Sequence, residues 1–285
     1  ADAAAALSAR DRQGSGQGLL GPGELAEFHH ETRSTTCKGC ENFCPITVNR
    51  FSGGRTYVSG NRCERFFHTG GGPKPELPNL HREKRDMLAA LAPVRGDRPT
   101  VGLPLGLGMY ELAPFWRAFF QALGFGVKLS GFPDAESYAK GQHSIPSDTA
   151  CYPAKLMHGQ IVKLLSMGVD AVFSPCATWN VDERASDNCY NCPLVAYYPE
   201  LLIDNMDELR EITFLHPFVD LNNRRELARE LRDALLPLAG DIKMGQMRRA
   251  VHIAFLALED WKAEVRRRGE EAVAYARQNG LKIMI

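Results

Sequence analysis

From residue 98 onward, the hydrophobic pattern alternates between strand-like and helix-like segments. Residues 100–105 are a short apolar run that ends in Gly106-Leu107-Gly108, which predicts a buried strand followed by a tight turn. The next apolar positions recur at helical spacing up to the glycines that follow Leu123. The stripe consists of Leu112, Phe115, Trp116, Phe119, Phe120 and Leu123.

The same alternation continues through the rest of the chain. Pro153 suits the first turn of another helix, and long helices are predicted over 222–239 and 244–279. Strands that alternate with helices indicate a parallel sheet with helices on its faces. We therefore expect the α/β class, with a Rossmann-like open parallel sheet and flanking helices. Its further strands are expected at 127–130, 170–174 and 212–215.

The residues before this region predict a small cysteine-rich β-hairpin module. Ile46 and Val48 alternate with polar residues, 52–55 form a turn, and 56–58 return. Glycines and prolines are dense over 69–80, which favours a domain boundary. The expected organisation is a linker or leading helix (1–31), a cysteine-rich metal or iron–sulfur module (32–70), a linker (71–97), an α/β cluster-binding domain (98–217) and a helical segment that ends at the start of a further strand (218–285).

Both ends of the chain suggest a piece of a longer polypeptide. The sequence begins without Met and ends in the apolar run 281–285. A natural C-terminal strand is the alternative explanation of that run.

Charge and composition favour a cytoplasmic protein that binds neither nucleic acid nor membranes. The 34 basic and 34 acidic residues cancel, so no overall field attracts polyanions. No apolar stretch approaches the roughly 18–20 residues of a membrane span. The first residues lack a basic segment followed by an apolar one, so we expect a reducing compartment. Eight cysteines in such a compartment favour metal ligation, with disulfides as the alternative.

The first cysteine group is compact. Cys37, Cys40 and Cys44 have the spacing C-x2-C-x3-C and precede Pro45, and Cys63 follows across the hairpin. Four thiolates suit either a [4Fe–4S] cluster or a tetrahedral zinc ion. Zinc ribbons prefer two paired C-x2-C knuckles, and Cys63 has no such partner. The prediction therefore favours an iron–sulfur cluster, and a zinc ion remains the alternative.

The second cysteine group is spread over loops that follow predicted strands. Cys176 comes directly after the strand at 170–174, at the carboxyl edge where open α/β sheets bind ligands. Cys151 precedes a predicted helix, where free N–H groups and the helix dipole favour a thiolate. Cys189 and Cys192 lie in a polar loop, and spacing does not decide which of them is a ligand, although Cys192-Pro193 fits better. Small buried cysteines are the alternative for Cys151 and Cys176.

Other motifs in the sequence give weaker evidence of a functional site. Gly106-Leu107-Gly108 lacks the third glycine of a dinucleotide loop, so a tight strand-to-helix turn is the expected role. His143, His158 and His216 lie near the predicted edge, where a structural role is the first expectation and contact with a cofactor the alternative. GxxxxGK[ST], GxSxG and HExxH do not occur in the sequence.

Several stretches resemble a known family. The segments at 98–125, 145–161, 174–176 and 191–202 resemble the central region of large proteins related to 2-hydroxyacyl-CoA dehydratase activators, the CoA-substrate-specific enzyme activases. That region is similar to cluster-bearing dehydratase subunits and to double-cubane cluster proteins. The segment at 36–65 resembles the same architecture, and the resemblance covers roughly residues 30–217.

The resemblance implies a cluster held by Cys151, Cys176 and Cys192, either [4Fe–4S] or, if a partner half contributes, an [8Fe–9S] double cubane. It also implies ATP-coupled low-potential electron transfer in an anaerobic system. The implied partners are activase-type ATPase domains and a dehydratase or reductase component, with a homodimer of the chain left open. The alternative function is a zinc-stabilised scaffold that binds a partner protein.

Overall fold

The computed structural model describes residues 26–52, 54, 56–63, 66 and 78–281. The chain divides into two compact units, unit 1 over residues 1–74 and unit 2 over residues 75–285. Most of the predicted leading segment 1–31, and nearly all of the terminal run 281–285, lie outside the described residues.

Unit 1 contains an antiparallel three-stranded sheet in the order β1-β2-β3. The predicted hairpin is present as β2 (Pro45–Phe51) and β3 (Thr56–Ser59). An additional strand, β1 (His30–Thr36), pairs with β2 along its whole length. The sequence analysis did not predict β1, because every one of its residues is exposed and its sequence has no apolar alternation.

Unit 2 is built on a four-stranded parallel sheet in the order β5-β4-β6-β8, which confirms the predicted fold class. The order changes direction at β4, since the chain moves from β4 to β5 on one side and then to β6 on the other. This is the arrangement of a doubly wound sheet. The strands are β4 (Arg98–Leu103), β5 (Phe125–Leu129), β6 (Ala171–Phe173) and β8 (Thr213–Leu215).

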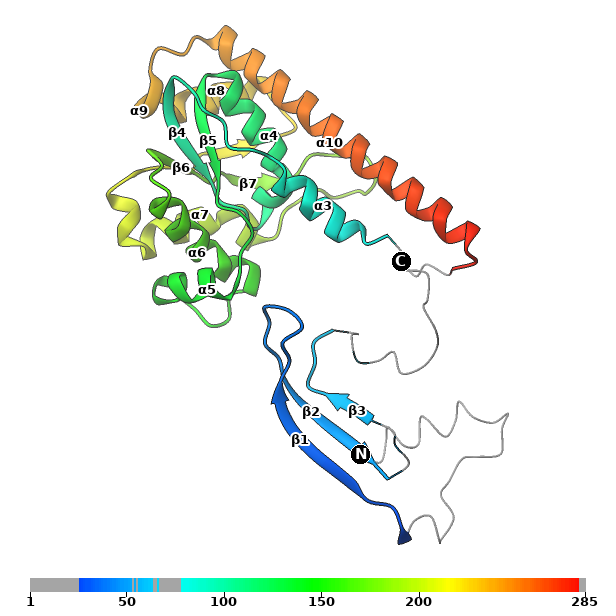
Figure 1. Ribbon diagram of the computed structural model, residues 1–285. Coiled ribbons are helices and arrows are strands. Elements are labelled where there is room, and N and C mark those ends of the chain that lie inside the picture. The colour runs from blue at the N-terminus through cyan, green and yellow to red at the C-terminus, as the bar shows by residue number, and fades with distance from the viewer. Residues whose placement is uncertain (1–25, 53, 55, 64–65, 67–77, 282–285) are drawn as a thin grey trace. The chain divides into compact units, whose positions relative to one another are not determined.

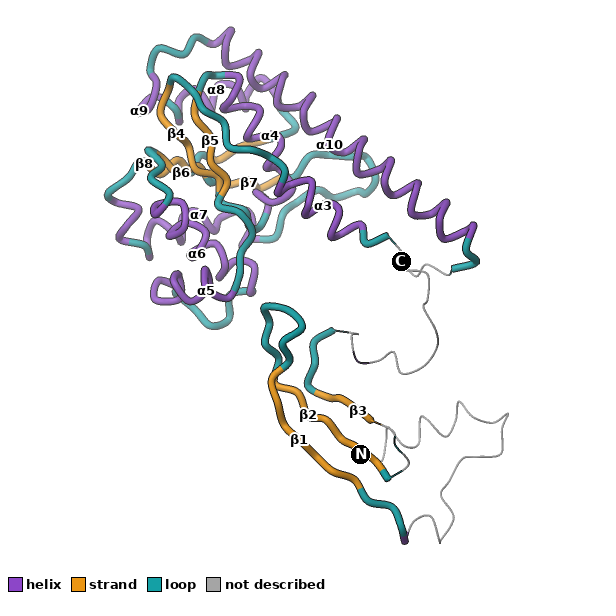
Figure 2. The backbone as a smooth tube through the Cα atoms, in the orientation of Figure 1, coloured by secondary structure: helices purple, strands orange, loops and turns teal. Residues whose placement is uncertain are grey.

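Helices cover both faces of this sheet (Figure 1). Apolar side chains of α4, α8 and α10 pack on one face, and those of α6 and α7 pack on the other. Figure 2 shows the sheet between these two helical layers. The helices are α4 (Gly108–Ala122), α5 (Ala135–Gly141), α6 (Tyr152–Ser166), α7 (Pro193–Asn205), α8 (Arg224–Ala234), α9 (Leu236–Ala239) and α10 (Met244–Gln278).

A second sheet extends the carboxyl side of unit 2. Strand β7 (Cys176–Trp179) follows β6 after two residues and pairs in parallel with β9 (Phe218–Asp220). The sequence analysis predicted neither of these short strands, nor α5 and α7. Strand β9 and helices α8 and α10 belong to the same layered structure as the sheet, so residues 218–281 are part of the α/β fold rather than a separate helical segment.

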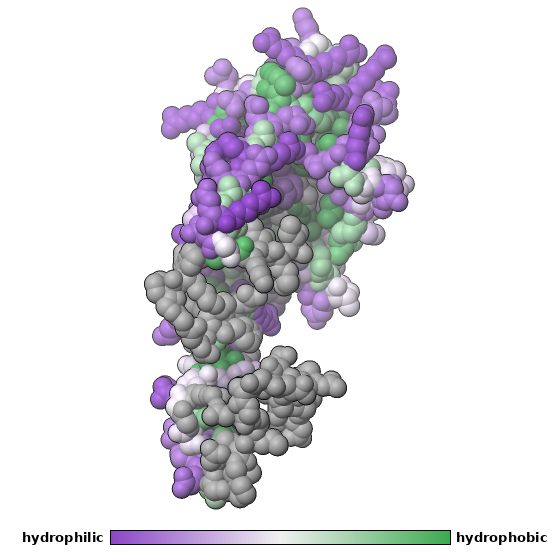
Figure 3. All heavy atoms as spheres, turned by 90° about the vertical axis from the view of Figure 1, so that its right-hand side faces the viewer, coloured by the Kyte–Doolittle hydropathy of each residue, from purple (hydrophilic) through white to green (hydrophobic). Residues whose placement is uncertain are grey.

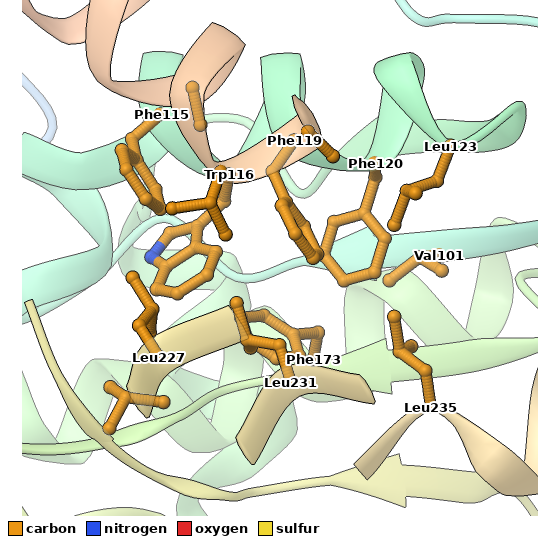
Figure 4. Packing of buried hydrophobic residues seen from close by; sticks show 14 of the residues in the cluster. Val101, Phe115, Trp116, Phe119, Phe120, Leu123, Phe173, Leu227, Leu231 and Leu235 are labelled. Atoms are coloured by element: carbon orange, nitrogen blue, oxygen red, sulfur yellow. The ribbon is translucent and has the colours of Figure 1, made fainter. Parts of the chain in front are cut away.

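Aromatic residues fill the core between α4, α8 and the sheet. Phe173 on β6 lies 4.7 Å from Trp116 and 5.0 Å from Phe120, measured between ring centroids. All three side chains are fully buried. Figure 4 shows the residues of α4 on one side of Phe173 and Leu227 and Leu231 of α8 on the other. This apolar layer holds the central strand in place.

Two elements differ from the sequence prediction in local detail. Helix α3 (Leu80–Ala89) lies within the stretch 71–97 that was predicted as a linker. The side chain of Asn79 caps its start by accepting from the Arg82 amide, and Leu88 is buried. The helix predicted over 222–239 is divided into α8 and α9, because Pro237 cannot continue the hydrogen-bond ladder of α8.

The surface of unit 2 seen in Figure 3 is mostly hydrophilic, with smaller apolar patches between the charged side chains. Helix α10 is 35 residues long, but charged residues recur along its exposed face. In the part of the chain that the structure describes, no helix is long and apolar enough to cross a membrane.

Replacing Phe173 by Ala should lower the free energy of unfolding by about 3–5 kcal/mol, because it removes the ring between α4 and α8 and leaves a cavity. Chemical denaturation measures this loss. Leu256→Ala is the matched control, since Leu256 is 51% exposed and its truncation should change stability by less than about 0.5 kcal/mol. Equal losses in the two variants would contradict the packing described above.

Candidate functional site

The candidate site lies at the carboxyl edge of the parallel sheet, where the strand order reverses. The turn after β4 and the turn after β6 face each other there, with the start of α7 closing the space. They line a cavity of about 60 Å³. Ligands bind at this position in open α/β sheets, because neighbouring loops diverge and leave a crevice. Lining residues include Gly106, Leu107, Gly108, Ser174, Pro175 and Tyr198.

Backbone strain occurs at the same place. Leu107 has φ 47° and ψ −135°, a conformation that side-chain-bearing residues rarely adopt. It precedes the first turn of α4 and is flanked by two glycines. The predicted tight turn at Gly106-Leu107-Gly108 is therefore present.

Cys151 and Cys192 occupy equivalent positions at this edge. Cys151 is the N-cap of α6, with φ −63° and ψ 150°, and Cys192 is the N-cap of α7, with φ −63° and ψ 154°. A proline follows within two residues in both helices. Both cysteines are exposed, and among the described residues neither thiol caps an amide of its own helix. Each thiol is therefore available next to the positive end of a helix dipole.

Cys176 differs from these two because it is buried. It is the first residue of β7, and its Sγ lies 3.8 Å from Oε1 of Glu200. Burial, followed by the negative charge of Glu200, raises the pKa of the Cys176 thiol to about 12. Glu200 Oε1 also lies 2.7 Å from Nδ1 of His216. Cys176 is thus a protonated thiol, and a metal would have to displace its proton.

Cys189 lies in the loop before α7, next to the end of β7. Its carbonyl accepts from the Asn180 amide, and Tyr190 stacks on Trp179 with 3.6 Å between ring centroids. The Asn191 amide donates to Thr178, so the whole Cys189–Cys192 loop is fixed to β7. The structure places both candidate cysteines of this loop near the same edge.

The structure does not bring the thiols together as a finished metal centre. Within the described ranges, no three side chains of Cys, His, Asp or Glu are grouped so that they could hold one metal ion. Helices α6 and α7 each present one soft thiol at their positive end, and thiols are the ligand type that zinc and iron–sulfur clusters take. The side chains of these thiols would have to move for one cluster to bind them.

In unit 1, strand register brings the four cysteines of the first group to one end of the sheet. Thr36 pairs with Pro45, so residues 37–44 form the loop between β1 and β2. Gly60, just after β3, packs against the Pro45 carbonyl, which directs Cys63 to the same end. The Gly39 amide lies 3.4 Å from Sγ of Cys37, and the Cys37 amide donates to the Cys44 carbonyl. This turn presents an N–H group to a thiol, as ligand loops of metal sites do.

A chain of buried polar side chains runs behind the thiol edge. His158 is fully buried, and its Nδ1 lies 2.8 Å from Ser144 Oγ. Its Nε2 lies 3.0 Å from the hydroxyl of Tyr198. Burial lowers the pKa of His158 to about 4, so the ring is neutral near neutral pH. Of the three histidines singled out in the sequence, only this one lies entirely within the protein interior.

The sequence analysis missed two side chains of this region, Tyr198 and Glu200. Both lie in α7, a helix that the sequence analysis did not predict. Burial raises the pKa of the Tyr198 hydroxyl to about 12. A tyrosine and a glutamate inside an otherwise apolar segment after Cys192-Pro193 were the available signal.

The fold and this edge define a doubly wound α/β domain with a small crevice at the carboxyl edge of its sheet. The chain belongs to the CoA enzyme activase family, since the family described as "CoA enzyme activase uncharacterised domain (DUF2229)" matches residues 100–285. This confirms the predicted relation to activases. The matched residues include the second cysteine group but not the first. No curated protein and no solved structure matches the chain.

The buried His158 predicts a specific dependence of stability on pH. Because its pKa is lowered in the folded state, its contribution is complete above the unfolded pKa and is lost as the pH falls from about 6.5 towards about 4. Between about pH 7 and about pH 5 the loss should be about 2 kcal/mol. Chemical denaturation at both pH values measures it.

The variant His158→Gln should lose this part of the pH dependence. The control His252→Gln, at an exposed position of α10, should retain it. If both variants had the same pH dependence as the parent chain, the neutral buried imidazole would be excluded.

Proposed function

We propose that this chain is the cluster-bearing part of an activase-type redox system. In this proposal Cys151, Cys176 and Cys192 hold an iron–sulfur cluster, [4Fe–4S] or half of an [8Fe–9S] double cubane. The observation that carries it is the pair of matching N-cap cysteines on α6 and α7 at the edge where Cys176 also lies. Membership of the activase family supports the same assignment.

The residues of the chain would help to bind the cluster. The N-termini of α6 and α7 direct positive partial charge to the edge, which favours the negative charge of thiolate ligands. When bound, such a cluster supplies one-electron transfer at a potential that thiolates, hydrogen bonds and exposure determine.

Glu200 has a role in this proposal because it is next to the buried thiol. Cys176 must lose its proton to become a ligand, and Oε1 of Glu200 is 3.8 Å from its Sγ. Nδ1 of His216 lies 2.7 Å from the same oxygen and helps to hold the carboxylate in place. Glu200 is thus placed to accept the proton when Cys176 binds iron.

The proposed partner proteins are inferred from the family, and not from a binding surface of the chain. An activase-type ATPase, in the same polypeptide or a separate one, would deliver electrons in an ATP-coupled step. A dehydratase or another reductase component would receive them. This places the proposed activity in an anaerobic cytoplasm, with a homodimer as a further possibility for completing a double cubane.

The first cysteine group favours a second, structural role for a metal in unit 1. Cys37, Cys40, Cys44 and Cys63 lie towards one end of a sheet that has few buried apolar residues, so a metal held by them would supply much of its stability. The amide of Gly39 supports a thiolate at Cys37. Zinc and [4Fe–4S] both suit this group, and a zinc-stabilised scaffold is therefore the second candidate function.

The proposal predicts iron and sulfide in the full chain after anaerobic purification, with about four or more irons per chain. Cys151→Ser and Cys192→Ser should each lose most of the iron bound in unit 2, because each removes a ligand. Cys189→Ser is the matched control and should retain iron. Metal analysis and visible absorption give the result. A colourless chain with only zinc would contradict the proposal.

For unit 1, Cys37→Ser should reduce the metal content without altering the spectrum of the unit 2 cluster. Unit 1 should then become sensitive to proteolysis, because the metal no longer links the ends of its strands. Ser34→Ala on β1 is the control and should leave both readouts unchanged. The metal that is lost identifies zinc or iron. Unchanged metal content and protease resistance would exclude a metal site in unit 1.

A further inference from the structure

The two cysteine-bearing helices are joined by a buried polar contact. His158 lies seven residues after Cys151 on α6, and Tyr198 lies six residues after Cys192 on α7. Both are therefore about two turns from the N-cap of their helix, or about 10 Å along its axis. Because α6 and α7 pack against each other in one apolar cluster, the Nε2–hydroxyl contact connects equivalent depths of the two helices.

The hydrogen bonds fix which groups donate in this contact. Ser144 Oγ donates to the Gly141 carbonyl, at 3.1 Å. It must then accept from Nδ1–H of His158, at 2.8 Å. This leaves Nε2 of the neutral ring as an acceptor, so the hydroxyl of Tyr198 donates to it. The chain of bonds has one direction and admits one tautomer of His158.

The far end of the chain is held by close backbone packing. Ser144 follows α5, and α5 packs directly on α6. A Cβ at Gly159 would overlap the Ser137 carbonyl oxygen, and one at Gly141 would overlap the backbone of Gly159. The two glycines permit this approach, so Ser144 cannot shift relative to α6 without opening that packing. The imidazole is therefore oriented from both sides.

The cost of breaking this contact is high because it is sealed from solvent. His158 and Tyr198 are both 0% exposed, and their rings meet edge to face, with 5.7 Å between centroids. A polar group that loses its partner in such a place is not compensated by water. An apolar interface between two helices allows small sliding motions, whereas one directional buried bond selects a single alignment.

We propose that His158 and Tyr198 are positioning residues that hold the N-caps Cys151 and Cys192 at one fixed separation. The fixed separation of the thiols does not depend on a bound metal. The fixed separation would present both thiols to one cluster without rearranging the helices, and this part of the proposal rests on the proposed function. Neither residue is expected to touch the cluster.

Distance measurement between spin labels tests the fixed separation directly. Nitroxides on Cys151 and Cys192 of the metal-free full chain, measured by pulsed electron double resonance, should give one narrow distance distribution. Tyr198→Phe removes the donor and should shift the balance between aligned and misaligned helices by about tenfold, which broadens or splits the distribution. The remaining accessible cysteines are replaced by Ser in all samples, namely Cys37, Cys40, Cys63 and Cys189.

Tyr197→Phe is the matched control, because it removes the same hydroxyl from the adjacent, exposed position of α7. It should leave the distribution narrow. Ser144→Ala is a milder second variant that frees the tautomer of His158 and should broaden the distribution even if Tyr198→Phe does not fold. An unchanged narrow distribution in both Tyr198→Phe and Ser144→Ala would overturn the proposal.

A second readout separates this proposal from the proposed function. In anaerobically purified chain with all cysteines present, Tyr198→Phe should alter the electron paramagnetic resonance signal of the reduced cluster, and Tyr197→Phe should not. If the parent chain holds no iron but the distance result stands, the proposed function fails and the positioning role remains. If the parent and Tyr198→Phe chains both hold a cluster and their spectra are identical, His158 and Tyr198 do not position the ligands of the redox site.

Discussion

Parallel pairing of the four central strands is the constraint on which the rest of unit 2 depends. Because β5, β4, β6 and β8 run in one direction, their carboxyl ends lie at one edge, and the loops that follow them must meet there. Helices α6 and α7 begin at that edge with a cysteine as N-cap. Residues far apart in the sequence, Cys151, Cys176 and Cys192, thereby lie towards the same edge of the unit 2 sheet.

The aromatic layer beneath α4 makes this arrangement rigid. Phe173 of the central strand is enclosed by Trp116 and Phe120, and α8 covers it from the other side (Figure 4). Val101 and Leu103 of the neighbouring strand β4 belong to the same core, and a strand fixed in this way can support strain in the loop that follows it, as at Leu107. The buried polar residues His158, Ser144 and Tyr198 then set the alignment of the helices on the opposite face. Packing therefore fixes the sheet, and hydrogen bonds fix the thiol-bearing helices.

The sequence predicted those parts of the fold whose hydrophobic pattern is strong. The stripe of α4 and the apolar runs of the sheet are recognisable because one face of each element is buried. Strand β1 was missed because both its faces are exposed, and α3 was missed because half of its residues are charged and it follows a stretch rich in glycine and proline. The short strand β7 forms by pairing with a distant segment, since Cys176 pairs with Phe218, 42 residues later in the sequence.

The site was only partly predictable for a related reason. Thiols are rare and chemically distinctive, so their grouping is visible in the sequence, but whether Cys176 is buried beside Glu200 depends on how α7 packs. The contact between His158 and Tyr198 joins residues 40 positions apart and has no local signature. Family membership supports an activase role without placing a cluster on particular thiols.

X-ray absorption at the iron edge of the anaerobically purified full chain tests the central claim most directly. The account predicts a first shell of sulfur and a second shell of neighbouring iron atoms, with the second shell diminished when Cys151, Cys176 and Cys192 are replaced by Ser. Iron surrounded by nitrogen and oxygen alone, or an iron–iron shell that the triple replacement leaves undiminished, would contradict it.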